Sequence, residues 1–209
     1  FIIVAVLLTD GQLQNASILW ESKTGATTRY VKRHLTPFGE VMPLRSALTF
    51  FSDLPNQVED FSPGKSAVIH QVGQAKIAPI ICFELIDDRL IQSSADQSNL
   101  FVVQTNSATF ANTSQSAQQL AITRIRSIEH ARYAVSVSTV GISAIIDTNG
   151  IVLKSTKENI AASINGAVAL NATRTIYDRV GEFAWVLVLL IGLGIGAGFG
   201  YAARVGKRR

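Results

Sequence analysis

A run of 21 uncharged residues near the C-terminal end, from Phe183 to Ala203, is the feature that most constrains this chain. As an α-helix rising about 1.5 Å per residue, the run would be roughly 30 Å long, which matches the apolar core of a bilayer. Aromatic residues lie near both of its ends and basic residues follow it. This pattern is typical of a membrane span whose C-terminal side is cytoplasmic. The sequence therefore predicts one transmembrane helix over 183–203, a basic cytoplasmic tail over 204–209 and a preceding domain outside the cytoplasm.

A buried core helix is the alternative explanation of this run, but core helices seldom extend so far without a charge. Within the run, Gly192, Gly196 and Gly200 share one face at four-residue spacing. Such a face suits close packing against another membrane helix. A helix that is merely rich in glycine explains the same spacing equally well.

The composition describes a folded domain without a nucleic-acid partner. The chain has 209 residues, of which 47% are hydrophobic and 16% charged, so it is long enough for one substantial domain and too apolar for disorder. Its net charge of +4 arises from Arg204, Lys207, Arg208 and Arg209 at the end of the chain. A nucleic-acid interface needs basic residues spread over a folded face, and the rest of the chain is neutral.

Metal and cofactor chemistry are not indicated. The chain has one cysteine, which excludes an internal disulfide and a cysteine-rich metal site. His34, His70 and His130 are far apart and lack the spacing of metal ligands. We therefore expect neither a metal nor another cofactor.

The pattern of apolar residues predicts an α/β domain with many strands. A buried strand over 1–8 leads through a turn at Asp10-Gly11 into strands over 15–20 and 29–34, followed by an ordered loop over 35–44. A helix over 115–132 has Ala117, Ala121, Ile125 and Ile128 on one face. The remaining elements that we expect are a helix over 85–95 and strands over 67–70, 75–81, 100–105, 133–139, 143–147, 151–155 and 167–170.

Cys82 lies where the apolar run 77–81 ends and a helical segment begins. A nucleophile at such a turn is exposed at the end of a sheet, and the helix N-terminus lowers the pKa of its thiol. A buried and inert cysteine is the commoner interpretation of this pattern taken alone. Lys32, likewise taken alone, reads as a solvated surface charge.

Two segments read together change that interpretation. Residues 32–40 read Lys-Arg-His-Leu-Thr-Pro-Phe-Gly-Glu, and Cys82-Phe83-Glu84 follows after about 40 residues. The combination resembles the nitrilase, or carbon-nitrogen hydrolase, superfamily, and within it the apolipoprotein N-acyltransferases. The similarity covers nearly the whole chain, and the other segments that agree are Thr105-Asn106 with Phe110, residues 124–129, residues 140–144, Asn149-Gly150 and residues 175–182.

The resemblance implies a fold and a set of site residues. The fold is a nitrilase-like α-β-β-α sandwich over 1–178, here without its first strand and helix, followed by the membrane helix. The site is a Glu-Lys-Cys triad in which Cys82 is the nucleophile and Lys32 stabilises the oxyanion. Glu40 and Glu84 match supporting acidic positions, and Phe83 stands where the family has tyrosine or phenylalanine.

The sequence departs from the family pattern in three places. The general-base glutamate of the family lies well upstream of the lysine, and only 31 residues precede Lys32 here, so we carry this role onto no residue. Because the chain begins at Phe1, we expect a fragment whose base lies upstream. Ser107 stands in place of an acidic residue and Ala111 in place of a glycine.

The activity implied by the resemblance is acyl transfer at the outer face of the plasma membrane. A fatty acyl chain would pass from a membrane phospholipid, through a Cys82 thioester, to the N-terminal amino group of the diacylglyceryl-cysteine of an apolipoprotein. The fragment alone is expected to be inactive. Two alternatives stay open: a membrane-anchored amidase or other carbon–nitrogen hydrolase with the same triad, and a non-catalytic paralogue.

Overall fold

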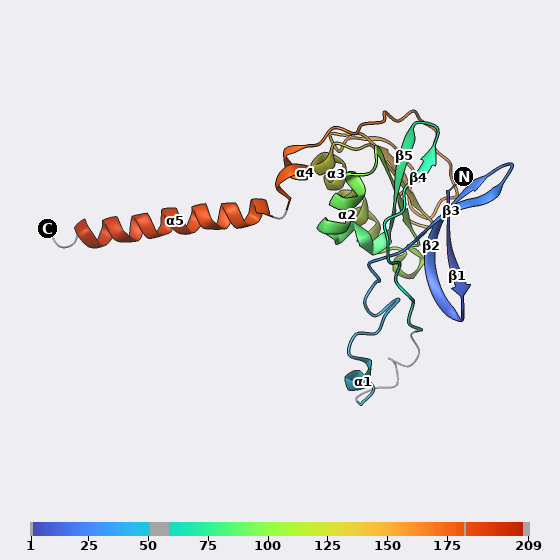
Figure 1. Cartoon of the computed structure of the whole chain (residues 1–209), viewed down its shortest axis with the longest axis horizontal. Coiled ribbons are helices and arrows are strands. Elements are labelled where there is room, and N and C mark those ends of the chain that lie inside the picture. The colour runs from blue at the N-terminus through green and yellow to red at the C-terminus, as the bar shows by residue number, and fades with distance from the viewer. Residues whose placement is uncertain (1, 51–58, 182, 207–209) are drawn as a thin grey trace.

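The computed structural model describes residues 2–50, 59–181 and 183–206, which form two β-sheets, a layer of helices and a long C-terminal helix (Figure 1). The first sheet is antiparallel and contains β1 (Ile2–Thr9), β2 (Gln12–Glu21) and β3 (Gly25–Val31). Asp10 and Gly11 form the turn between β1 and β2 with φ angles of 52° and 76°. Glycine adopts this left-handed region without strain and aspartate tolerates it, so the predicted turn is confirmed.

The second sheet has six strands in the order β4-β5-β6-β7-β8-β9. Only the pairs β5–β6 and β6–β7 are parallel. Parallel neighbours need a crossover connection, and here these contain the helices α2 (Asp88–Ala95) and α3 (Gln115–His130). The strands are β4 (His70–Val72), β5 (Ala75–Ile81), β6 (Leu100–Thr105), β7 (Ala134–Ser138), β8 (Ala144–Ile146) and β9 (Val152–Ser155).

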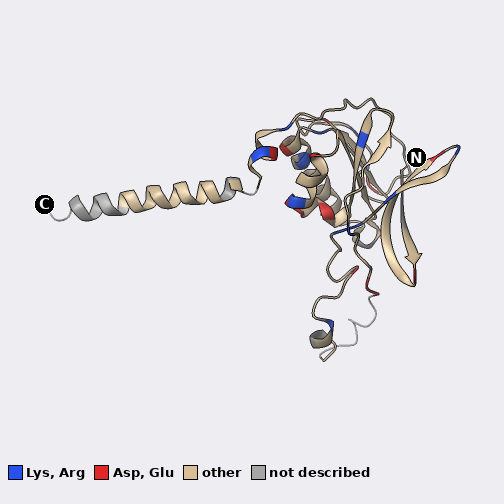
Figure 2. Ribbon diagram, in the orientation of Figure 1, with Lys and Arg blue, Asp and Glu red and all other residues tan. Residues whose placement is uncertain are grey.

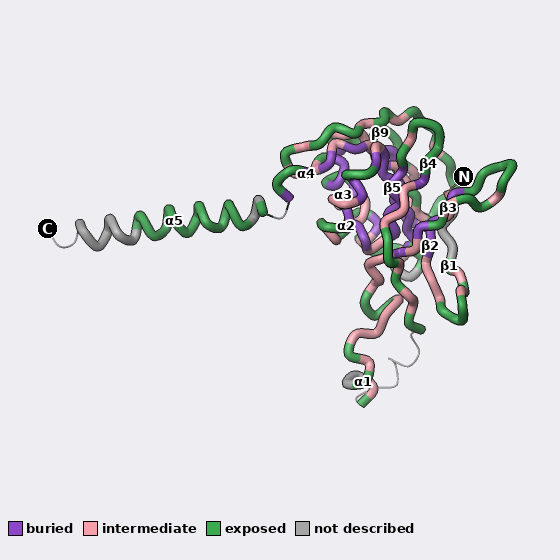
Figure 3. The backbone as a smooth tube through the Cα atoms, in the orientation of Figure 1, coloured by how far each residue is buried: buried purple, intermediate pink, exposed green. Residues whose placement is uncertain are grey.

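Both faces of the central strands are buried (Figure 3). Side chains alternate between the two faces of a strand. Phe101 and Val103 of β6 therefore pack in a cluster with Ile91 of α2, whereas Leu100 and Val102 pack on the opposite face. Because both faces need apolar side chains, residues 100–103 of β6 read as one continuous apolar run. The strand predicted over 100–105 is confirmed, and its burial on both faces explains why its sequence shows it.

Polar side chains join the two sheets. The Ser17 hydroxyl of β2 donates to Oε1 of Gln104 in β6 at 2.7 Å. The fully buried His70 ring lies between two hydroxyls, 3.3 Å from Ser17 and 2.6 Å from Thr28. Burial lowers the pKa of His70, so its neutral ring can accept from one hydroxyl and donate to the other.

The segment around the expected helix 85–95 is more complex than its sequence indicates. A 3₁₀ helix, η2 (Cys82–Ile86), precedes α2, and the chain changes direction between them at Asp87. The Asp87 carboxylate accepts a hydrogen bond from the Leu90 amide at 3.0 Å, and a capping carboxylate of this kind fixes the start of a helix. The remaining short elements are α1 (Arg45–Leu48), η3 (Ala108–Phe110) and α4 (Ile176–Val180).

Three expectations of the sequence are wrong. Of the strand expected over 67–70, only His70 belongs to a strand, β4. Residues 167–170 form no strand, and only Val168 among them is half-buried, since no neighbouring strand pairs with this segment. The apolar face of α3 does not pack inside the domain: Ile125 and Ile128 are 51% and 54% exposed.

The buried face of α3 is polar, and its charged groups have partners. Arg126 donates to the Leu85 carbonyl at 2.8 Å and pairs with Asp88 at the start of α2. His130 Nδ1 lies 2.5 Å from the buried Asp178 carboxylate of α4. These contacts satisfy the Arg126 guanidinium and the Nδ1 atom of His130, which would otherwise be costly to bury against the sheet and α4.

The last helix, α5 (Phe183–Gly206), extends away from the sheets (Figure 1). Its described residues carry no charge over 186–199, and every one of them is exposed (Figures 2 and 3). Within the part of the chain that the structure describes, no helix combines the length and the hydropathy that a membrane span requires. The span expected over 183–203 is thus not shown by the structure, and residues 207–209 of the expected tail lie outside the described residues.

Candidate active site

Cys82 lies at the carboxyl end of β5, where the strand turns sharply into η2. Its backbone φ of 52° is in the left-handed region, which costs a residue with a side chain about 1–2 kcal/mol. Strain of this kind persists only where the surroundings impose it, and it is common at functional sites. The turn leaves the half-buried thiol at the edge of the sheet, on the wall of a cavity.

Lys32 follows β3 directly and is only 1% exposed. Its Nζ atom donates to Oε2 of Glu40 at 2.5 Å and to Oγ1 of Thr36 at 2.9 Å. The other oxygen of Glu40 accepts a hydrogen bond from the Asn15 side chain at 2.9 Å. The lysine ammonium is therefore buried, paired and held by two side chains of the loop that follows it.

The Glu40 carboxylate is stabilised in its charged form. Burial on its own would raise its pKa, but hydrogen bonds from Lys32, from the backbone of Thr36 and from Asn15 outweigh that effect and lower it. Glu40 is therefore ionised at neutral pH. The ionised carboxylate fixes the position of the Lys32 ammonium.

Lys32, Glu40 and Cys82 line the same cavity, which has a volume of about 850 Å³. The cavity lies at the carboxyl ends of β5, β6 and β7, which is the edge where open α/β sheets bind their ligands. Its lining includes polar side chains, among them the lysine and the thiol. It also includes apolar side chains, those of Ile2, Val6, Phe38, Phe61, Phe110 and Val137 among them.

The thiol of Cys82 is protonated at neutral pH in this environment. Burial raises its pKa, and the nearby Lys32 ammonium lowers it without cancelling that rise. Glu40 acts in the opposite direction to Lys32. Because the thiolate is the nucleophilic form, reaction at Cys82 requires a proton acceptor.

Glu84 lies behind the cavity and connects the segments that carry Lys32 and Cys82. Its Oε1 atom accepts hydrogen bonds from the Tyr30 hydroxyl at 2.6 Å and from the Arg33 amide at 2.7 Å. Its Oε2 atom accepts from the amide of Ile81 at 2.8 Å. Burial raises the pKa of Glu84 in spite of these donors, and it raises that of Tyr30 far above its ordinary range, so the phenol stays a donor.

Phe83 lies outside this arrangement. Its ring packs edge-on against the ring of His34, with centroids 5.3 Å apart. Among the predicted site residues, Lys32, Glu40 and Cys82 come together at the cavity and Glu84 supports them from behind. Phe83 packs beside them.

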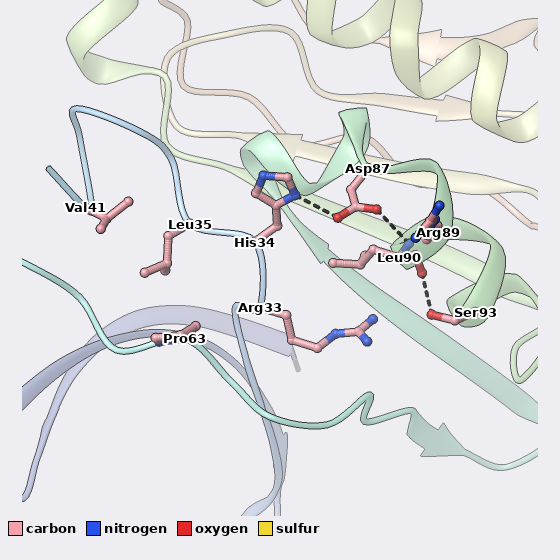
Figure 4. A pocket seen from close by; sticks show the side chains of 9 residues that line it. All are labelled: Arg33, His34, Leu35, Val41, Pro63, Asp87, Arg89, Leu90 and Ser93. Carbon is pink, nitrogen blue, oxygen red and sulfur yellow. Dashed lines mark hydrogen bonds and ion pairs between the residues drawn. The ribbon is translucent and has the colours of Figure 1, made fainter. Parts of the chain in front are cut away.

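A second cavity of about 700 Å³ is lined by a different set of residues (Figure 4). Arg33, His34, Asp87, Arg89 and Ser93 contribute its polar side chains. Nδ1 of His34 and Oδ2 of Asp87 pair there at 2.7 Å. Lys32, Glu40 and Cys82 do not line this second cavity, so the Cys82 thiol does not face it.

Sequence reasoning missed several side chains that complete the site. Asn15 and Thr36 hold Glu40 and Lys32, Tyr30 holds Glu84, and the side chain of Gln119 in α3 acts to lower the pKa of the Cys82 thiol. Tyr30 could have been found, because it precedes Lys32 by two residues and the strand expected over 29–34 places both on one face. Among the residues that the structure describes, no group of three or more His, Cys, Asp or Glu side chains could hold a metal ion.

Comparison with known proteins identifies the family. Residues 1–177 match the carbon-nitrogen hydrolase family. The apolipoprotein N-acyltransferase of Geobacter metallireducens is 35% identical over 159 residues, which are 75% of this chain and 30% of that protein. The proteins of the same name from Mycolicibacterium smegmatis and Rickettsia typhi are 32% and 29% identical, over 85% and 89% of this chain. The chain spans 30% to 40% of the length of these three relatives.

Solved structures agree on the fold. The Saccharomyces cerevisiae protein Nit3, a member of the nitrilase superfamily, matches with a TM-score of 0.58 at 15% identity, over 75% of this chain and 54% of that protein. A carbon-nitrogen hydrolase from Helicobacter pylori matches with a TM-score of 0.55 at 14% identity, over 75% of this chain and 59% of that protein. The expected nitrilase-like α/β fold is confirmed, and the chain belongs to the carbon-nitrogen hydrolase family.

Proposed function

We propose that this chain carries the nucleophile of an apolipoprotein N-acyltransferase. Cys82 takes a fatty acyl chain from a membrane phospholipid and passes it to the N-terminal amino group of diacylglyceryl-cysteine on an apolipoprotein. The observation that carries the proposal is the shared cavity of Cys82, Lys32 and Glu40, whose lining also includes large apolar side chains. The names of the similar proteins from three bacteria support the choice of reaction within the family.

The first half of the reaction forms a thioester. The Cys82 thiolate attacks the ester carbonyl carbon, a C–S bond forms, and the carbonyl electron pair moves to oxygen. The Lys32 ammonium stabilises this oxyanion, an interaction typically worth about 3 kcal/mol. When the oxyanion collapses, the ester C–O bond breaks and the lysophospholipid leaves as an alcohol after taking up a proton.

The second half transfers the acyl chain. The amine nitrogen attacks the thioester carbon, a C–N bond forms, the C–S bond breaks and the nitrogen loses a proton. The raised pKa of Cys82 means that both halves need a group that accepts and returns protons. The family resemblance assigns this role to a glutamate that it matches to no residue of this chain. Glu40 instead positions Lys32, because its carboxylate is already ion-paired.

The apolar side chains that line the cavity suit an acyl chain. Phe38 and Phe110 are 64% and 44% exposed although both are large and apolar. Burying such a side chain against an acyl chain stabilises the complex by about 25 cal/mol per Å² of apolar surface removed from water. These side chains favour a lipid over a small polar amide as the acyl donor.

We further propose that α5 holds the catalytic domain at the outer face of the plasma membrane, with the C-terminus in the cytoplasm. Its side chains over 186–199 are uncharged and exposed. Exposed apolar surface of this extent marks contact with a membrane or another apolar partner. Both proposed substrates lie at the membrane surface, so attachment there would bring them to Cys82.

Supplying the two kinds of acyl donor separately tests the function. The complete protein that carries this chain is incubated with a phospholipid of defined acyl chain, or with a small amide, and a diacylglyceryl-cysteine peptide is added. The expected result is N-acylated peptide with the phospholipid only, and none with the Cys82→Ala variant. Acylation of Cys82 by the amide only would indicate a hydrolase, and reaction with neither donor would indicate a non-catalytic protein.

A further inference from the structure

His34 contacts the nucleophile turn, residues 82–87, without lining the substrate cavity. It belongs to the first of the two motifs that indicate the family, and the proposed reaction gives it no role. Its ring packs edge-on against the ring of Phe83, the residue after Cys82, with centroids 5.3 Å apart. Its Nδ1 atom lies 2.7 Å from Oδ2 of Asp87 (Figure 4). His34 lines the second cavity and not the one that contains the nucleophile.

The two contacts lie at opposite ends of η2. Phe83 is the second residue of this 3₁₀ helix, and Asp87 directly follows its last residue. Asp87 also caps α2, because its Oδ1 atom accepts from the Leu90 amide at 3.0 Å. One imidazole ring thus contacts the start of the nucleophile turn and the junction of the turn with the next helix.

The carboxylate decides which group donates in the contact between His34 and Asp87. Burial on its own would raise the pKa of Asp87, but hydrogen bonds from the Leu90 amide and from His34 outweigh it and lower that pKa. Asp87 is thus ionised at neutral pH and can only accept, so Nδ1 of His34 carries a hydrogen and donates it. One carboxylate oxygen binds the helix and the other binds the ring, which fixes the two relative to each other.

We propose that His34 is a positioning residue for the nucleophile: it holds the turn at Cys82 in its strained conformation and at a fixed distance from the Lys32 ammonium. The φ of 52° at Cys82 is unfavourable for a residue with a side chain, so packing around the turn must impose it. Lys32 and His34 are two residues apart in one segment, and the His34 ring packs on the residue after Cys82. This inference rests on Cys82 being the nucleophile of the proposed function.

Glu84 holds the same segment through its backbone. Its Oε1 atom accepts from the amide of His34 at 3.3 Å, which fixes where the His34 backbone lies. The His34 ring adds contacts to Phe83 and Asp87, which come before and after Glu84 in the turn. Both ends of η2 are therefore held to the segment that carries Lys32.

Two substitutions separate the two contacts of the ring. His34→Asn keeps a nitrogen donor at the position of Nδ1 and removes the ring from Phe83, whereas His34→Phe keeps a ring and removes the donor to Asp87. The complete protein is given increasing amounts of phospholipid, and the acyl-enzyme is followed as the mass of the peptide that contains Cys82. Because misplacement of a reacting group slows the chemical step, we expect each variant to lower the maximal rate of acyl-enzyme formation about tenfold. The half-saturating concentration of phospholipid should stay at the wild-type value.

Alkylation of Cys82 by iodoacetamide tests the same geometry without an acyl donor. The Lys32 ammonium acts to lower the pKa of the Cys82 thiol, although burial outweighs it. A turn that moves away from Lys32 should therefore shift the midpoint of the alkylation profile to higher pH in both variants. A failure of the proposed function appears as absent lipid transfer in the wild type, and it leaves this comparison intact.

Ser93→Ala is the matched control, because Ser93 lines the same second cavity and its hydroxyl donates to the Leu90 carbonyl within α2 at 2.8 Å. It should match the wild type in both assays. A merely structural role of His34 predicts a lower melting temperature with unchanged rate and alkylation profile, and that result overturns the proposal. A higher half-saturating concentration at an unchanged maximal rate would mean that His34 acts on the substrate, and it would overturn the proposal as well.

Discussion

Nζ of Lys32 lies 2.5 Å from Oε2 of Glu40 in a pair that is almost fully shielded from water, with the two side chains 1% and 13% exposed. Both residues line the cavity that contains Cys82. A buried cation held in this way needs no reorganisation when negative charge develops on a substrate. The pair contributes to stability and has a proposed role in the chemistry, and these two roles can be separated.

Lys32→Met should destabilise the protein and abolish acyl transfer. The change leaves the Glu40 carboxylate buried without its cation, and removal of one partner of a buried pair typically costs about 3–5 kcal/mol. We expect the free energy of unfolding, measured with urea, to fall by about 3 kcal/mol. The double variant Lys32→Met/Glu40→Leu should recover part of that loss but no activity. Wild-type turnover by Lys32→Met would contradict the role of the ammonium.

Acid should destabilise the protein in part through Glu40. The pKa of Glu40 is lower in the folded state than in the unfolded chain, where it is about 4.3. Its contribution is therefore fully present above the unfolded value and is lost as the pH falls through the folded value. Glu84 has a raised pKa and acts with the opposite sign.

A comparison of the wild type with Glu40→Gln isolates the contribution of Glu40 to the pH dependence of stability. The thermal midpoint of the variant should decline less steeply between pH 6 and pH 3 than that of the wild type. Parallel curves for the two proteins would mean that Glu40 is not protonated in this window.

Glu84→Gln should weaken the connection between the Lys32 and Cys82 segments. A glutamine has one oxygen, so the amide of Ile81 would lose its acceptor or meet an N–H group. A buried donor without a partner costs about 1–3 kcal/mol. Calorimetry should show a lower melting temperature, and Glu59→Gln, a change of an exposed glutamate, should show none. Equal melting temperatures for the two variants would be inconsistent with the role of Glu84.

Gly64→Ala should displace the segment that carries Lys32. A Cβ atom at this glycine would lie 2.2 Å from the carbonyl oxygen of Val31, which is backbone and cannot rotate away. The amide of Gly64 also donates to the Lys32 carbonyl at 2.8 Å. We expect lower stability and at least a tenfold loss of kcat/KM. Gly39→Ala is the stability control, because its Cβ would meet only Thr36 at 3.7 Å, an ordinary contact.

The sequence predicts well those elements that depend on residues close together in the chain. The continuous apolar run of β6, the Asp10-Gly11 turn and the apolar strand that ends at Cys82 all follow from neighbouring residues. Lys32, Glu40 and Cys82 were assigned through their motif spacing, and the structure brings them to one cavity. Spacing along the chain indicates which residues belong to the motif, but it does not show that Lys32 forms an ion pair with Glu40.

The errors have a common physical reason, because they depend on contacts between distant residues. Arg126 can be buried because the Leu85 carbonyl, 41 positions away, accepts its hydrogen bond. Apolar periodicity gives no information on such a partner. It therefore indicates the face of Ile125 and Ile128 as the buried one. Asn15, Tyr30 and Gln119 escaped notice likewise, because their partners are set by the packing of strands and of α3 against the turn at Cys82.

The mass of the peptide that contains Cys82 is the most direct test of acyl transfer through this residue. The complete protein is incubated with a phospholipid of one defined acyl chain, without acceptor, and then digested at acidic pH, where thioesters persist. The account predicts that Cys82 gains the mass of one acyl group and loses it when a diacylglyceryl-cysteine peptide is added. An unmodified Cys82 in a preparation that transfers acyl chains, or undiminished transfer by Cys82→Ala, would contradict it.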